Sequence, residues 1–106
     1  MTVYELCEKL PLTMIGQEDN CVVGCVFCCD LLSIAMSKAP ESSAWVTVIG
    51  NANAVAVAAL ADVSCIVLAE GFSFDEAAIS AAKGKVALLK SDKPIYETAV
   101  SIGALL

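Results

Sequence analysis

The sequence predicts an α/β fold: a single compact domain over residues 1–106, with a mostly parallel sheet of four or five strands flanked by helices. Three observations predict it. A chain of 106 residues has the length of one ordinary domain. Strand-like apolar runs alternate with helix-like runs through residues 44–106, and the connections between them are short. Such alternation builds a parallel sheet covered by its crossover helices.

The first elements are predicted from caps and apolar runs. Thr2 and Glu5 have the spacing of a capping box, which predicts a helix over residues 2–10. Residues 12–15 form a short apolar run that ends in a polar turn, as a strand would. Residues 21–28 are a longer continuous apolar run, and this pattern predicts a strand buried on both faces.

The rest of the chain alternates regularly. Asp30 is placed to cap a helix that ends before Pro40. Ser73 and Glu76 repeat the capping-box spacing, and Pro94 stands near the first position of a helix, where proline is accepted. The expected strands are residues 44–49, 65–69 and 85–89, and the expected helices are residues 30–39, 54–61, 73–83 and 94–106.

Charge excludes several classes of function. The chain has six Lys, twelve Asp plus Glu, no Arg and no His, for a net charge of −6. A nucleic-acid partner is not expected, because phosphate binding needs a cationic surface. Without His there is no side chain that ordinarily titrates near neutrality, and without Arg there is no bidentate fork for carboxylate or phosphate. The sequence therefore predicts a protein that is not an enzyme.

Hydropathy raises the question of what covers the surface. Apolar residues make up 58% of the chain and charged residues 17%, with a mean hydropathy of +0.79. Residues 42–61 are uncharged, but Gly50, Asn51 and Asn53 interrupt them, so two short elements are expected rather than a membrane span. We therefore expect no membrane partner and a homo-oligomer, with a two-fold dimer as the default, contacting through residues 21–35 or the helix 54–61.

Six cysteines and no recognisable signal peptide predict a cytoplasmic protein with free thiols. Cys21, Cys25 and Cys28 reproduce the C-x3-C-x-aromatic-C spacing of iron–sulfur enzymes that use S-adenosylmethionine, and Cys29 follows directly. Thiolates at such spacing can hold a metal or an iron–sulfur cluster. The favoured interpretation is that these cysteines fill a buried strand as small apolar residues. A metal or iron–sulfur protein remains the alternative, and no cofactor is expected.

The candidate ligand site is the turn Gly50-Asn51-Ala52-Asn53. It follows a strand and opens a helix, so backbone N–H groups and the helix dipole would point at an anion. Ligands of parallel sheets settle beyond the carboxyl ends of the strands. Gly50, Asn51 and Asn53 are therefore predicted to contact a small anion or nucleotide, together with Asp30, a carboxylate at the end of another element. The favoured interpretation of the turn is an ordinary asparagine helix cap, and the ligand site is the alternative.

Several segments, in order, resemble one known family. They are Asp30-Leu31-Leu32-Ser33, Ala44-Trp45-Val46-Thr47-Val48, Asn53-Ala54-Val55-Ala56-Val57-Ala58 and Cys65-Ile66-Val67-Leu68-Ala69-Glu70. From about residue 22 to residue 106 the chain is similar to the DRTGG domain family, above all to its stand-alone members associated with iron-only hydrogenase systems. It departs from them just before Asp30, where residues 20–26 contain one Gly and neither Asp nor Arg. Whatever the family's motif does at that place is not carried over.

The resemblance implies a fold similar to the N-terminal domain of HPr kinase. It also implies a noncatalytic module that accompanies or regulates other activities. In larger proteins such domains sit beside nucleotide-binding CBS modules and contribute to dimer contacts. The expected function is accordingly a regulatory or interaction module, homodimeric, binding a small anionic ligand or nucleotide and associated with hydrogenase-related proteins or redox metabolism.

Overall fold

Five strands form one sheet in the order β1-β5-β4-β3-β2. The structure, a computed structural model, describes residues 1–15 and 20–106. Strands β2 to β5 run parallel to one another, and β1 pairs antiparallel with β5, which confirms the predicted fold class. The strands are β1 (Thr13–Met14), β2 (Cys25–Cys28), β3 (Ser43–Thr47), β4 (Cys65–Leu68) and β5 (Ala87–Lys90), and the helices are α1 (Val3–Lys9), α2 (Leu32–Lys38), α3 (Ala52–Leu60), α4 (Glu76–Ala82) and α5 (Ile95–Gly103).

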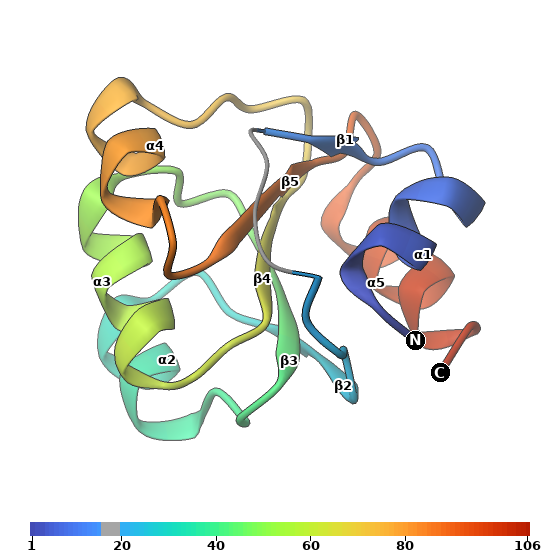
Figure 1. The fold of residues 1–106 in the computed structure, drawn as a ribbon, viewed down its shortest axis with the longest axis horizontal. Helices are drawn as coiled ribbons and strands as arrows, with labels where there is room; N and C mark the ends of the chain where they lie inside the picture. Colours follow the sequence, from blue (N-terminus) through green and yellow to red (C-terminus); the bar gives the residue numbers. More distant parts are fainter. Residues whose placement is uncertain (16–19) are drawn as a thin grey trace.

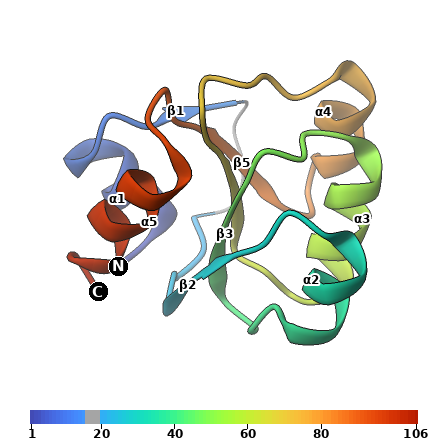
Figure 2. The same cartoon turned by 180° about the vertical axis from the view of Figure 1, so that it is seen from behind.

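The helices cover the sheet in two layers. Helices α2, α3 and α4 each connect neighbouring parallel strands and lie in a row on one face (Figure 1). Crossovers of one hand between successive neighbours place all three helices on the same side. Helices α1 and α5 cover the opposite face, as the reverse view also shows (Figure 2), and α5 packs over β2 and β3.

The core is divided by the sheet into two apolar clusters. Trp45, Ile66 and Leu68 face the layer of α2, α3 and α4. Val46 and Val67 face α1 and α5, where they meet side chains that include Leu6 and Ile102. Because successive side chains of a strand point to opposite faces, β3 and β4 supply both clusters. This explains why their sequences are apolar without interruption.

The predicted strand over residues 21–28 is wrong in extent and in burial. The strand begins only at Cys25, and β2 is the last strand of the sheet instead of a central one. Its side chains are half-buried or, at Cys28, exposed. Val22 precedes the strand and forms an isolated bridge to Thr2. The continuous apolar run therefore forms an edge strand whose side chains are not fully buried on either face.

The caps agree with the prediction in part. Thr2 and Glu5 form the expected capping box at α1. At α4 the cap is Asp75, whose side chain accepts from the Ala78 N–H, and not Ser73. The predicted cap of α2 is wrong, because α2 begins after Leu31 without a side-chain cap. The carboxylate expected there, that of Asp30, bonds to the neighbouring strand instead.

Helix α3 is buried on several sides, as its apolar composition predicted. It lies between α2 and α4 and contacts both. Val57 is 5% exposed and belongs to the core, so it cannot contact a second copy and a charge placed there would act on folding. Leu60 and Ala56 are the exposed apolar residues of this helix.

No helix among residues 1–15 and 20–106 is long and apolar enough to cross a membrane. The uncharged stretch over residues 42–61 is instead divided between β3 and α3. Gly50 and Asn51 form the turn between them, as the sequence indicated.

Candidate functional site

The predicted ligand residues lie at the carboxyl edge of the parallel strands, where β2 and β3 end. The Asp30 Oδ1 atom accepts hydrogen bonds from the Thr47 hydroxyl at 2.7 Å and from the Val48 N–H at 2.9 Å. Thr47 is fully buried, and its Oγ1 also accepts from the Ile49 N–H at 3.2 Å. Asp30 thus joins the segment after β2 to the end of β3. The sequence did not predict this structural role.

The turn at residues 50–53 is shaped by packing and capping. The Asn51 side chain accepts from the Ala54 N–H at 3.0 Å, so it is the cap of α3. The Gly50 carbonyl accepts from the Asp75 N–H at 3.0 Å. Asn53 is exposed within the first turn of α3. The favoured interpretation of this turn, an ordinary asparagine helix cap, is confirmed at Asn51.

A lysine from β5 lies beside this turn. Lys90 ends β5, and its Nζ donates to the Ser73 Oγ at 3.1 Å. The backbone of Ser73 in turn packs directly against Gly50. Because the carboxyl ends of β3 and β5 lie at the same edge, the ammonium group reaches the neighbourhood of the α3 N-terminus. The sequence separation between residues 50 and 90 hid this juxtaposition.

Glu70 occupies the same edge for a structural reason. Its carboxylate Oε2 accepts from the Ile95 N–H at 3.1 Å and so serves the open N-terminus of α5. Its backbone adopts φ +62°, a left-handed conformation that is uncommon for a residue other than glycine. The backbone N–H of Glu70 donates to the Lys93 carbonyl at 2.8 Å, which holds this turn against α5.

The cysteines proposed as metal ligands do not converge. Cys25 and Cys28 are three residues apart on β2, so their side chains point to opposite faces of the sheet. Cys21 precedes the strand and is exposed. Among residues 1–15 and 20–106, no group of three or more Cys, Asp and Glu side chains is arranged to hold a metal ion. The metal alternative therefore has no support from the arrangement of these thiols.

The six thiols differ in their surroundings. Burial raises the pKa of the Cys65 thiol to about 12, and the nearby Cys7 and Cys21 thiols act in the same direction. Burial also raises the pKa of Cys7. The pKa of Cys28 is raised by partial burial and then by the Asp30 carboxylate. The thiolate is the reactive form of cysteine, so none of these three thiols is activated.

We expect Cys65 to stay unmodified by a thiol reagent in the folded protein and to react only after denaturation. It is fully buried, whereas Cys21 and Cys28 are exposed and should react first. Mass spectrometry of the labelled protein measures this. Modification of Cys65 at the rate of Cys21 under native conditions would contradict the prediction.

The raised pKa of Cys65 makes the free energy of unfolding depend on pH. In the unfolded chain the Cys65 thiol ionises near 9, whereas in the fold it stays protonated to about 12. The unfolded state therefore loses this proton first, and the stability that the thiol contributes is complete below pH 9 and falls as the pH rises to about 12. The difference in unfolding free energy between the protein and Cys65→Ala should shrink over that range.

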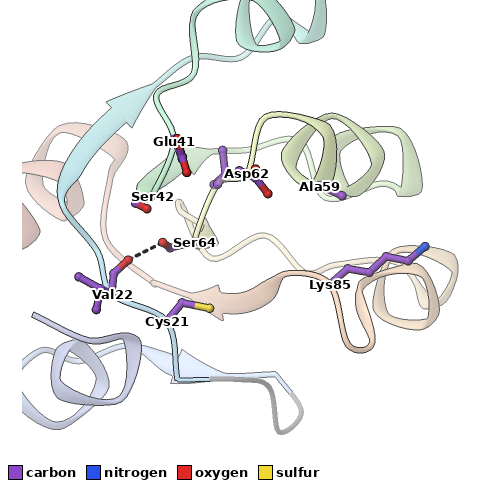
Figure 3. A pocket seen from close by; sticks show the side chains of 9 residues that line it. Cys21, Val22, Glu41, Ser42, Ala59, Asp62, Ser64 and Lys85 are labelled. Atoms are coloured by element: carbon purple, nitrogen blue, oxygen red, sulfur yellow. Dashed lines mark hydrogen bonds between the residues drawn. The ribbon is translucent and has the colours of Figure 1, made fainter.

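A pocket lies at the opposite, amino-terminal edge of the strands, and nothing in the sequence predicted it (Figure 3). Its volume is about 400 Å³. The Ser64 hydroxyl donates to the Val22 carbonyl at 2.5 Å and closes one wall. Ser42 and Asp62 adopt left-handed backbone conformations and are joined by a hydrogen bond from the Ser42 N–H to the Asp62 carbonyl. The lining residues are Cys21, Val22, Glu41, Ser42, Ala59, Asp62, Val63, Ser64 and Lys85.

The chemistry of this pocket is modest. It offers one exposed thiol at Cys21, two exposed carboxylates at Glu41 and Asp62 and one ammonium group at Lys85. Figure 3 shows the Lys85 side chain extending away from Cys21 and Ser64. The lining residues come from four separate stretches of the chain, so no local sequence motif predicts the pocket. These groups do not form a nucleophile and base in contact.

Comparison of the chain with protein-family models and with curated proteins finds no match. The resemblance to the DRTGG family therefore rests on the four sequence segments given above and stays a prediction.

Proposed function

We propose that the domain is a noncatalytic interaction module that works as a homodimer. The observation that carries this proposal is a set of exposed apolar side chains at the two ends of β2. We call it the β2 surface: the outer edge of β2 together with Val22, Leu31 and Ile34. These three side chains are 61%, 55% and 42% exposed. Val22 precedes the strand, and Leu31 and Ile34 follow it into α2.

The charge pattern of this region supports an interface. Asp30 is the one charged residue between residues 21 and 37, and its Oδ1 atom already accepts two hydrogen bonds. Depletion of charge distinguishes the centre of protein interfaces from the remaining surface. Burying apolar area contributes about 25 cal/mol per Å², and a stable interface covers about 800 Å² on each partner. The regulatory role and the association with hydrogenase or redox metabolism rest on the family resemblance alone.

Light scattering during gel filtration tests the proposal. At tens of micromolar the protein should have a mass of about 22 kDa, twice the 11.0 kDa of the chain. Leu31→Glu and Ile34→Glu should shift the mass toward one chain, because a carboxylate in an apolar interface is costly. Leu60→Glu is the matched control, since Leu60 is exposed on α3 and outside the β2 surface. A protein that has the mass of one chain at every concentration would contradict self-association.

A small anionic ligand or nucleotide is the second proposal, favoured by Lys90 beside the turn that opens α3. Backbone N–H groups at a helix N-terminus and an ammonium group both attract anions, whereas the nearby Asp30 carboxylate disfavours them. Thermal unfolding with inorganic phosphate or adenine nucleotides tests it, because a bound ligand raises the melting temperature. The rise should disappear in Lys90→Gln. No rise with millimolar ligand would remove this part of the proposal.

A further inference from the structure

β2 is the last strand of the sheet, so one of its edges faces away from β3. The Ser64 N–H donates to the Ser43 carbonyl and the Ala69 N–H to the Thr47 carbonyl, both at 2.9 Å. The odd-numbered residues of β3 therefore point their backbone groups at β4. Because these groups alternate along a strand, the even-numbered residues point at β2.

The register then fixes which groups of β2 face outward. Ala44 is paired with Val26, and Val46 with Cys28. In a parallel ladder a residue bonds the two neighbours of its partner, so β3 bonds the backbone of Cys25 and Phe27. The N–H and C=O groups of Val26 and Cys28 consequently point away from the sheet. Among the described residues, the backbone bonds outside helices and strands include none from these four groups.

These four groups are complementary to a second copy of themselves. The geometry points to antiparallel pairing of β2 with β2 of a second copy, about a two-fold axis that passes Phe27. In this register the Val26 N–H donates to the Cys28 carbonyl of the other copy, and the Cys28 N–H donates to its Val26 carbonyl. The symmetry repeats both bonds, so four hydrogen bonds satisfy all four groups. The inference rests on the proposed homodimer and specifies how it is built.

The surroundings of the edge favour this occupant. A row of unpaired N–H and C=O groups is a template for another strand, and proteins commonly protect such edges with charged residues or proline. β2 has neither, since its sequence is Cys-Val-Phe-Cys. A two-fold interface brings the same surface of both chains together. In the register centred on Phe27, Leu31 would lie opposite Val23 of the second copy and near its exposed Val22.

Proline at position 28 provides the sharpest variant. Cys28→Pro removes the outward N–H but no donor to β3, and the side chain it replaces is exposed. Cys28→Ser is the matched control, because it removes the same thiol and keeps the N–H. We expect Cys28→Ser to keep the mass of two chains and Cys28→Pro to show the mass of one. Circular dichroism checks that both variants are folded.

Hydrogen exchange of the unmodified protein tests the register without a substitution. The amide protons of Val26 and Cys28 should be protected in the concentrated protein and exchange rapidly on dilution to the single chain. The amide proton of Phe27 should be protected in both, because in this register the Phe27 N–H donates to β3. A dimer in which Val26 and Cys28 exchange rapidly would overturn this pairing while leaving the homodimer intact. A protein that is one chain at all concentrations would overturn both.

Discussion

Trp45→Ala is expected to lower the free energy of unfolding by about 3–5 kcal/mol, the range for removing a large aromatic side chain from a core. Trp45 is 0% exposed and lies in the cluster between the sheet and α2, α3 and α4. Its indole N–H also donates to the Cys29 carbonyl at 2.9 Å. That bond holds the segment between β2 and α2 over β3. A domain with about 5–15 kcal/mol of total stability would be close to unfolding.

Trp45→Phe separates the two contributions. Phenylalanine keeps much of the apolar volume but leaves the Cys29 carbonyl without its donor, so a smaller loss is expected. Urea unfolding followed by far-ultraviolet circular dichroism measures all three proteins, because the fluorescence of the only tryptophan is lost in both variants. A loss below about 1 kcal/mol for Trp45→Ala would show that the side chain is not packed as described.

Gly50→Ala is expected to lower the unfolding free energy by about 1–3 kcal/mol, the usual cost of overpacking. A Cβ atom at Gly50 would lie 2.9 Å from the Leu68 Cδ2, 3.1 Å from the Ser73 carbonyl oxygen and 3.3 Å from the Phe74 Cα. Leu68 is fully buried and two of the three atoms belong to the backbone, so little can move. The glycine is thus required by the close approach of the segment that precedes α4.

Gly103→Ala is the matched control for this substitution. Gly103 ends α5, and a Cβ atom there meets no atom within 4 Å. Alanine favours a helix over glycine by about 0.5–1 kcal/mol, so this variant should be as stable as the protein or slightly more stable. Thermal unfolding compares the two. Equal melting temperatures for Gly50→Ala and Gly103→Ala would contradict the packing role of Gly50.

The elements of this fold could be predicted from sequence because local signals and periodicity agree. The capping box at Thr2 and Glu5 acts within one helical turn, and the turn at Gly50 and Asn51 joins two elements directly. The alternation from β3 onward leaves few topologies for a parallel sheet. These features depend on residues close together in the chain.

The errors concern contacts between distant residues. An Asp before a helix can cap it or bond elsewhere, and Asp30 bonds Thr47 because β3 ends beside it. The apolar run before it indicated a strand, but it could not say that β2 is at an edge. The Ser73 backbone packs beside Gly50, and Lys90 bonds to the Ser73 hydroxyl. Lys90 belongs to β5 and lies forty residues after Gly50 in the chain, so its place beside the turn depends on the pairing of distant strands. The sequence therefore indicated the turn at residues 50–53 but not the lysine beside it.

The two edges of the sheet differ in a way that limits assembly. β1 has two residues, Thr13 and Met14, and closes the edge opposite to β2. An edge strand this short offers few backbone groups to another strand and so protects the edge against further pairing. A sheet with two long open edges could add chains at both ends and polymerise into a filament. In the proposed dimer, β2 is occupied by its symmetric copy and only β1 lies at each outer end. Growth would then terminate at two chains, and the association would stay finite at any concentration.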